Sequence, residues 1–248
     1  PRTQRASLTM VPKRQTVRPP VADLRPDAPR AAHVPDARGA SAPLVEVFAS
    51  VQGEGRFVGE PQIFVRLAGC PLRCRYCDTE HSWSPAGARV EASTVVERVL
   101  ELDGARPRTV SITGGEPLVW PDFVRELARD LRESNGVRRV HLESSGAPLE
   151  ALFEVIDQLD HLSLDLKAPE DLAALPRWDQ GDTPIELPAD DAGWTEHRRA
   201  LLPKLEGRDA VLKLVLTARG SFDGYARVID DVARLAPNVP VVLQPATA

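Results

Sequence analysis

All three cysteines of the 248-residue chain lie in one short segment, residues 70–77, with the sequence CPLRCRYC. Cys70, Cys74 and Cys77 follow the spacing C-x3-C-x2-C, and three thiolates on one loop can bind three irons of a cubane 4Fe-4S cluster. Because the chain has no fourth cysteine, the fourth iron would keep an open coordination site. Such a site can bind a small molecule through an amine and a carboxylate. S-adenosylmethionine (SAM) carries both groups.

A structural zinc ion is the alternative occupant, with His81 close enough in sequence to be its fourth ligand. Zinc-binding cysteines usually form two spaced pairs, whereas this triplet is compact and directly follows a predicted strand. With Tyr76 before its last cysteine, the triplet resembles the C-x3-C-x-aromatic-C motif of the radical SAM superfamily. In that superfamily, an electron from the cluster cleaves SAM into methionine and a 5′-deoxyadenosyl radical that abstracts hydrogen from the substrate. We therefore expect an enzyme with a cluster on Cys70, Cys74 and Cys77, rather than a zinc-stabilised binding module.

The bulk composition favours a small-molecule enzyme over a nucleic-acid-binding or membrane protein. Hydrophobic residues make up 42% of the chain and charged residues 27%, with a formal net charge of −5. Nucleic-acid-binding surfaces are usually basic, and no apolar run approaches the roughly 20 residues that span a bilayer. The cysteines include no distant pair that could form a stabilising disulfide, which favours the reducing cytoplasm.

The chain divides into a leader and a core. Residues 1–43 are rich in Pro, Arg, Ala and Asp and show neither strand alternation nor a helical stripe, so we expect a disordered leader. From residue 44 to 248, apolar runs alternate with helical patterns, which is typical of βαβ units around a mostly parallel sheet. The fold class that follows is α/β, a partial (β/α) barrel of the radical SAM type, with an ordered loop or lid over 169–191. Strands are predicted at 62–67, 109–113, 139–143, 162–166, 211–216 and 241–244, and helices at 93–102, 122–134, 149–159 and 222–235.

Polar and glycine residues follow several of these strands, where a barrel carries its chemistry. The paired glycines of the segment 113–117, TGGEP, let a backbone approach a ligand closely, although a strand-to-helix turn explains them equally well. Glu143, at the end of the third predicted strand, could accept hydrogen bonds from a ribose, while the following Ser144 and Ser145 could serve either a ligand or a turn. Asp165 and Lys167 form a charged pair inside an apolar run, which favours a ligand role. His161 and Lys213 are interpreted as structural or rim residues.

A closer resemblance rests on longer motifs: residues 48–55 (FASVQGEG), 59–61 (GEP), 64–70 (FVRLAGC) and 77–79 (CDT). In this combination the chain is similar to the 7-carboxy-7-deazaguanine synthase family of queuosine and deazapurine biosynthesis. The resemblance implies a carbon–nitrogen lyase that converts 6-carboxy-5,6,7,8-tetrahydropterin to 7-carboxy-7-deazaguanine with loss of ammonia and regeneration of SAM. It also implies Mg²⁺, an electron donor such as flavodoxin or ferredoxin, and a homodimer.

The resemblance also assigns site residues motif by motif. Gln52 suits the amide-like edge of the pterin, Arg66 suits a carboxylate, and Thr79 matches the Mg²⁺ position. Asp165 stands where a shorter hydroxyl residue can occur. The substrate contacts implied are Val51, Gln52, Gly53, Arg66 and Thr113, and the SAM contacts are Gly115, Asp165, Leu166, Lys167, Gln244 and Pro245, beside Glu143.

Three points stay open at this stage. The same radical SAM core could belong to a glycyl-radical activase or to an antibiotic-pathway paralogue, although an activase often needs further cluster cysteines and the chain has none. The leader is not part of the family core. Family members usually continue beyond the Gln244-Pro245 motif, so a truncated C-terminal end is a further expectation.

Overall fold

The computed structural model describes residues 39–103, 108–134, 136–178 and 185–246. Most of the predicted leader, residues 1–38, lies outside the described residues. Residues 41–43, which the sequence assigned to the leader, form the start of strand β1 (Ser41–Val51). Among the helices described, none combines the length and apolar character that a membrane span needs.

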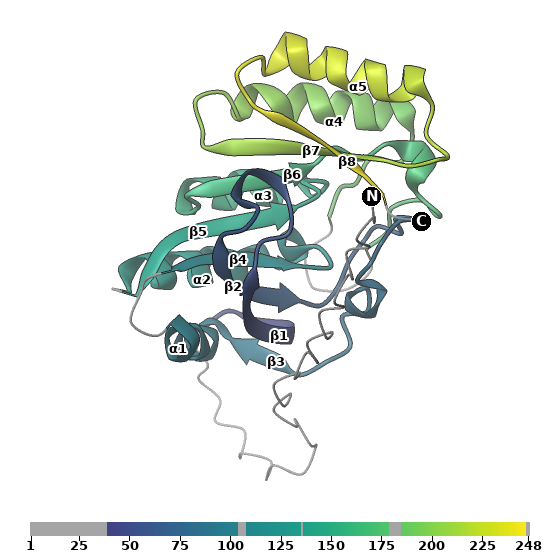
Figure 1. The fold of residues 1–248 in the computed structure, drawn as a ribbon. Helices are drawn as coiled ribbons and strands as arrows, with labels where there is room; N and C mark the ends of the chain where they lie inside the picture. The colour runs from purple at the N-terminus through teal and green to yellow at the C-terminus, as the bar shows by residue number, and fades with distance from the viewer. Residues whose placement is uncertain (1–38, 104–107, 135, 179–184, 247–248) are drawn as a thin grey trace, which may run out of the picture. The chain divides into compact units, whose positions relative to one another are not determined.

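One twisted sheet of eight strands organises the described residues, in the order β3-β1-β2-β4-β5-β6-β7-β8 (Figure 1). Strands β2 and β4 to β8 are parallel, whereas β1 is antiparallel to both of its neighbours. Within the described residues, β3 and β8 are the two edges and the sheet does not close. The prediction of a mostly parallel, partial barrel is therefore confirmed. The remaining strands are β2 (Pro61–Leu67), β3 (Arg89–Glu91), β4 (Arg108–Gly114), β5 (Val137–Ser144), β6 (His161–Asp165), β7 (Ala210–Leu216) and β8 (Val241–Pro245).

The helices connect the parallel strands and pack against the sheet (Figure 1). Four of them match the predicted helices: α1 (Ala92–Asp103), α2 (Pro121–Glu133), α3 (Leu149–Val155) and α5 (Phe222–Leu235). The end of the third predicted helix is instead a 3-10 turn, Ile156–Gln158.

Helix α4 (Asp191–Leu201) was not predicted, because two of its four buried residues are polar. His197 Nε2–H donates to the carbonyl oxygen of Gly146 at 2.7 Å, and Arg198 donates to Asp231 on α5 at 3.0 Å. These partners are distant in sequence, so the buried stripe of α4 does not appear as an apolar pattern. The side chain of Asp190 caps its first turn by accepting from the Gly193 N–H at 2.8 Å.

The two faces of the sheet differ in polarity. Side chains alternate along a strand, so every second residue of the central strands points to the helices. That face is apolar and fully buried, and it forms the main core with the helices. The opposite face carries polar residues along the central strands. The helix-facing residues include Ile63, Val65, Val110, Ile112, Val140, Leu142, Leu164 and Leu212, and the polar face includes Gln62, Ser111, His141, Glu143, Asp165 and Lys213.

Candidate active site

The cysteine loop leaves the carboxyl end of β2 and is fixed by backbone hydrogen bonds. The Cys70 N–H donates to the Trp83 carbonyl at 3.1 Å, and Cys74 forms an isolated antiparallel bridge with Leu172. Arg73 donates to the Cys70 carbonyl at 2.8 Å and lies over the Trp83 ring. The loop that follows β6, which was predicted as part of a lid, therefore holds the cysteine loop in place.

The three cysteines are free and line one cavity. Burial raises the pKa of Cys70 to about 12, with the nearby Glu116 carboxylate acting in the same direction, and burial also raises the pKa of Cys74. Binding of a metal must therefore displace the protons of these two thiols. All three face one cavity, and three soft thiolate ligands suit iron and sulfide. Among the described residues, no three Cys, His or carboxylate groups have the arrangement of ligands around a single metal ion. The exposed His81, the expected fourth ligand of a zinc ion, does not line the cavity.

The paired glycines after β4 explain how the cysteine loop and this strand come together. A Cβ on Gly114, whose φ is +138°, would lie 2.1 Å from the Leu67 carbonyl oxygen, and a Cβ on Gly115 would lie 2.4 Å from that of Gly69. The Gly115 N–H donates to Leu67 at 3.0 Å. The glycines thus permit close backbone packing between two strand ends, beside their predicted approach to a ligand.

Glu116 is buried between this turn and the end of β5. Its carboxylate accepts hydrogen bonds from the Ser144 hydroxyl at 2.6 Å, from the Ser145 N–H at 2.9 Å and hydroxyl, and from the Leu118 N–H at 3.1 Å. Burial raises the pKa of Glu116, while these four donors oppose the shift. Both serine hydroxyls therefore donate to a carboxylate and orient the loop, which favours the turn role over the ribose contact.

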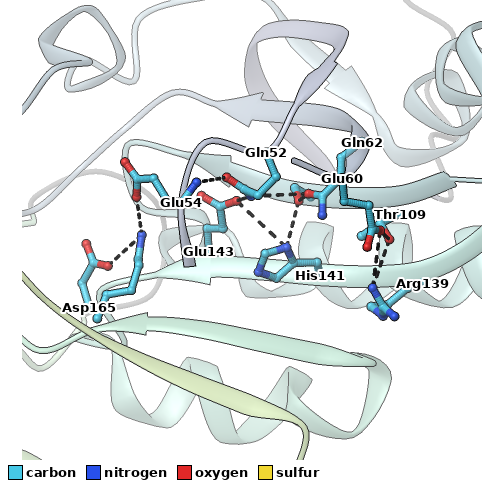
Figure 2. A network of polar contacts seen from close by, with 11 residues as sticks. Gln52, Glu54, Glu60, Gln62, Thr109, Arg139, His141, Glu143 and Asp165 are labelled. Atoms are coloured by element: carbon cyan, nitrogen blue, oxygen red, sulfur yellow. Dashed lines mark hydrogen bonds and ion pairs between the residues drawn. The ribbon is translucent and has the colours of Figure 1, made fainter. Parts of the chain in front are cut away.

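Glu143 and Gln52 also line the cavity and belong to the network of polar contacts in Figure 2. Gln52 Nε2 donates to Glu143 Oε1 at 2.6 Å and approaches Gln62 Oε1 at 3.4 Å, and Gln52 Oε1 accepts from the Glu54 N–H at 3.1 Å. Behind them, Ser111 donates to Gln62 at 2.5 Å and contacts His141 Nδ1 at 2.9 Å. Burial raises the pKa of Glu143, whereas Lys213 and the Gln52 hydrogen bond lower it.

A second polar group joins the ends of β6 and β7. Asp165 Oδ2 accepts from Lys167 Nζ at 2.7 Å, and Asp165 Oδ1 forms an ion pair with Lys213 Nζ at 3.1 Å. Burial opposes ionisation of Asp165, but Lys167 and Lys213 outweigh it and lower the pKa to about 2. Lys167 also donates to Tyr76 on the cysteine loop at 3.2 Å. Asp165 and Lys167 thus compensate each other's charge in an ion pair, and their ligand role stays a prediction.

The remaining predicted residues lie around the rim. Arg66 donates to Glu46 at 2.8 Å and lies over the Phe48 ring, so its guanidinium is already partly engaged. The Thr79 hydroxyl lies 3.7 Å from Cys77 Sγ. Gln244 and Pro245 end β8 beside Val215 and Leu216 of β7.

One cavity of about 680 Å³ collects nearly all of these residues. Leu166 is the exception: it is buried in the apolar core, so its side chain does not face the cavity. Glu54, Glu116 and Lys213 also line the cavity and were not among the predicted site residues. For Lys213 the signal was available, because a lysine inside the apolar run VLKLVL is as costly as Lys167 unless it is paired. The predicted residues that line the cavity are Val51, Gln52, Gly53, Arg66, Cys70, Cys74, Cys77, Thr79, Thr113, Gly115, Glu143, Asp165, Lys167, Gln244 and Pro245.

A partial barrel with a three-cysteine loop after an early strand defines a radical SAM protein, and the Radical SAM superfamily model matches residues 65–184. A Geobacter sulfurreducens protein named 7-carboxy-7-deazaguanine synthase is 31% identical over 225 residues, which cover 83% of this chain and 82% of that protein. The chain therefore belongs to the 7-carboxy-7-deazaguanine synthase family.

Further relatives with the same name match shorter stretches. The Methanothermobacter thermautotrophicus protein is 40% identical over 60% of this chain and 59% of its own length, and the Pyrobaculum aerophilum protein is 44% identical over 47% and 52%. The chain thus spans little more than half the length of these two relatives. The crystal structure of QueE from Escherichia coli has a TM-score of 0.47 and 23% identity, covering 82% of this chain and 94% of that one. At this level the likeness adds nothing to the family assignment.

Proposed function

We propose that this protein catalyses the radical SAM ring contraction of 6-carboxy-5,6,7,8-tetrahydropterin to 7-carboxy-7-deazaguanine, with release of ammonia. One observation carries the proposal: apart from Leu166, the residues assigned to SAM and those assigned to the pterin line the same cavity as the three cysteines. When bound, the 4Fe-4S cluster and SAM supply a 5′-deoxyadenosyl radical, which abstracts hydrogen from the substrate.

The cysteine side of the cavity suits SAM. Gly115 offers backbone next to the cysteine loop. Glu143, which the sequence assigned to the ribose of SAM, is assigned to the pterin instead, because it is bonded to Gln52 of the pterin segment. Lys167 links Asp165 to Tyr76, so the charged pair holds the ends of β6 and of the cysteine loop together. Gln244 and Pro245 close this side from the edge of the sheet.

The opposite side of the cavity suits the pterin, with one change to the expected contacts. The Gln52 amide is buried and already bonded to Glu143 and to the Glu54 N–H, so it acts by fixing these groups rather than by pairing with the pterin edge through both of its atoms. The carboxylates of Glu54 and Glu143 then provide acceptors for pterin N–H groups. Arg66 and Thr113, neighbours on β2 and β4, provide donors for a carboxylate.

Mg²⁺ belongs to the proposal through Thr79. Its hydroxyl faces the cavity next to the cysteine loop, and oxygen ligands from substrate and water would complete the octahedron that Mg²⁺ prefers. The variant Thr79→Val keeps the side-chain shape and removes the oxygen. Stimulation of turnover by Mg²⁺ should disappear in this variant, whereas equal stimulation of the wild type and Thr79→Val would remove Thr79 from the proposal.

An electron donor such as flavodoxin or ferredoxin, a homodimer and a cytoplasmic location complete the proposal. They are supported by the membership of the family and by the reducing conditions that a cysteine-held cluster needs.

The test is anaerobic reconstitution with iron and sulfide, followed by incubation with SAM, Mg²⁺, a reductant and the carboxytetrahydropterin. Mass spectrometry should detect 7-carboxy-7-deazaguanine and ammonia release with the wild type and neither with Cys74→Ala. A reconstituted cluster that cleaves SAM but leaves the pterin unchanged would keep the superfamily and refute the substrate.

A further inference from the structure

Lys213 connects the two halves of the cavity. It lies on β7 in register with Asp165 on β6, and its side chain is almost fully buried. Its Nζ lies 2.9 Å from Glu54 Oε2 and 3.1 Å from Asp165 Oδ1. Glu54 adjoins the segment assigned to the pterin and Asp165 belongs to the segment assigned to SAM, and Figure 2 shows these two carboxylates at the same end of the polar network.

Lys213 is a cation shared by several carboxylates, one of which also has a second cation. Three carboxylates, those of Glu54, Glu143 and Asp165, act on this one ammonium. Asp165 has a second cation in Lys167, which is 2.7 Å away. Glu54 is paired with Lys213 at 2.9 Å, and Lys213 is the cation that acts to lower the pKa of Glu143.

We propose that Lys213 is a positioning residue for the reaction: its ammonium fixes an acceptor wall, the carboxylates of Glu54 and Glu143, that recognises the N–H edge of the pterin. This inference rests on the proposed function, because it assigns the pterin to that wall. Lys213 acts through these carboxylates and does not itself donate a proton to the reaction.

Burial explains why the Glu143 carboxylate of this wall needs a cation nearby. A buried carboxylate takes up a proton unless an opposite charge or hydrogen bonds compensate for the lost water. Burial raises the pKa of Glu143, and Lys213 and the Gln52 hydrogen bond oppose this, while Glu54 and Asp165 add to it. His141, 4.0 Å away, is kept neutral by its own lowered pKa, so it supplies no compensating charge.

The lysine itself stays charged. Burial lowers its pKa, but Asp165, Glu54 and Glu143 together raise it above the usual range. An ammonium with a raised pKa releases its proton less readily and is a poor general acid, which favours a positioning role.

Equilibrium binding of the carboxytetrahydropterin to the reconstituted, SAM-loaded enzyme tests the proposal, with the reductant omitted so that no turnover occurs. The variants are Lys213→Met, which removes the charge at similar length, Lys213→Arg, which keeps it, and Lys204→Met as the matched control on an exposed lysine. Lys213→Met should weaken pterin binding by about tenfold or more. Lys213→Arg should recover most of the affinity, and Lys204→Met should match the wild type.

Two further readouts separate positioning from general damage. SAM binding to Lys213→Met should stay within about threefold of the wild type, because Asp165 retains Lys167. Pterin affinity of Lys213→Met should rise with pH as Glu143 ionises, because the variant lacks the cation that lowers the pKa of Glu143, and it should rise more steeply than in the wild type. Both results distinguish a lost charge from a lost fold.

The outcomes are separable from those of the proposed function. If the wild type does not bind the pterin, the proposed function fails and this inference fails with it. If the wild type binds the pterin and Lys213→Met binds it equally well with no pH dependence, this inference alone is wrong. Should Lys213→Met fail to fold, Glu54→Gln removes the other end of the pair, and the proposal then requires a similar loss of pterin affinity with SAM binding retained.

Discussion

The side-chain amide of Gln52 donates a hydrogen bond to the carboxylate of Glu143, with 2.6 Å between Nε2 and Oε1. This contact joins the loop after β1 to the carboxyl end of β5, residues that lie 91 positions apart in the sequence. It fixes which atoms of both side chains remain free to face the cavity, and it is the basis of the first prediction.

Replacing Gln52 by glutamate should impair the pterin half of the cavity. The change sets a second carboxylate against Glu143, whose pKa burial has already raised, so one of the two must take up a proton. We expect the KM for the pterin to rise by about tenfold or more while SAM binding is retained. Steady-state kinetics and SAM binding measure the two effects. Gln158→Glu, outside the cavity, is the control, and equal KM values in both variants would contradict the account.

Gly115→Ala should disrupt the packing of the cysteine loop. The added Cβ would lie 2.4 Å from the Gly69 carbonyl oxygen and 2.7 Å from that of Ser82, both of them backbone atoms. Overpacking of this kind lowers the free energy of unfolding by about 1 to 3 kcal/mol. The free energy of unfolding measured by urea denaturation and the iron content after reconstitution should both fall. Gly87→Ala has no atom within 4 Å of the new Cβ and should change neither quantity.

Glu116→Gln tests how much the hydrogen bonds of the buried Glu116 carboxylate, which lines the cavity, stabilise the fold. Glutamine has the same shape but replaces one acceptor oxygen by an N–H₂ donor, so hydrogen bonds from Ser144, Ser145 or Leu118 are lost. The free energy of unfolding should decrease by about 2 to 3 kcal/mol. The exposed Glu133→Gln provides the comparison in the same urea titration. Equal stability of the two variants would mean that the Glu116 hydrogen bonds contribute little to folding.

The buried histidine pair predicts how stability depends on pH. Burial lowers the pKa of His161, with Arg139 and Arg56 acting in the same direction and Asp209 opposing them; burial and His161, with Lys213 and Arg139, lower the pKa of His141 well below its usual value. Below about pH 6.5 the unfolded chain therefore binds more protons than the folded one, so the free energy of unfolding falls as pH falls.

His161→Phe should reduce this acid sensitivity. Phenylalanine keeps an aromatic ring against Phe57, which lies 4.5 Å from the His161 ring between centroids, and removes one titrating group. The slope of unfolding free energy against pH should decrease by up to about 1.4 kcal/mol per pH unit on the acid side. Urea titrations of the iron-free protein at several pH values measure it, with the exposed His81→Asn as control. A slope that is unchanged in His161→Phe would show that His161 is not held neutral.

The sequence predicted the parallel strands well, because their apolar and β-branched runs are bounded by glycine, proline and polar residues. It did not predict α4, whose buried stripe includes His197 and Arg198 with partners on distant elements. It did not predict the short edge strand β3 either, which is only three residues long. Such elements depend on tertiary contacts rather than on a local pattern.

The candidate site was predictable where a motif marks a strand end. The cysteines, Gln52 and the pair Asp165 and Lys167 all follow from motifs or from charges inside apolar runs. Leu166 was assigned by its place between those charged residues, yet alternation turns its side chain into the core. The bridging role of Lys213 depends on the register of β6 against β7, which only the structure provides.

The central claim is that one cavity holds SAM against the pterin so that SAM is reused. The most direct measurement is the ratio of 7-carboxy-7-deazaguanine formed to SAM consumed, under anaerobic, reduced conditions with the reconstituted protein and limiting SAM. We expect many product molecules for each SAM lost, and none with Cys74→Ala. SAM cleavage to 5′-deoxyadenosine without deazaguanine product, or one SAM destroyed for each product, would contradict the account.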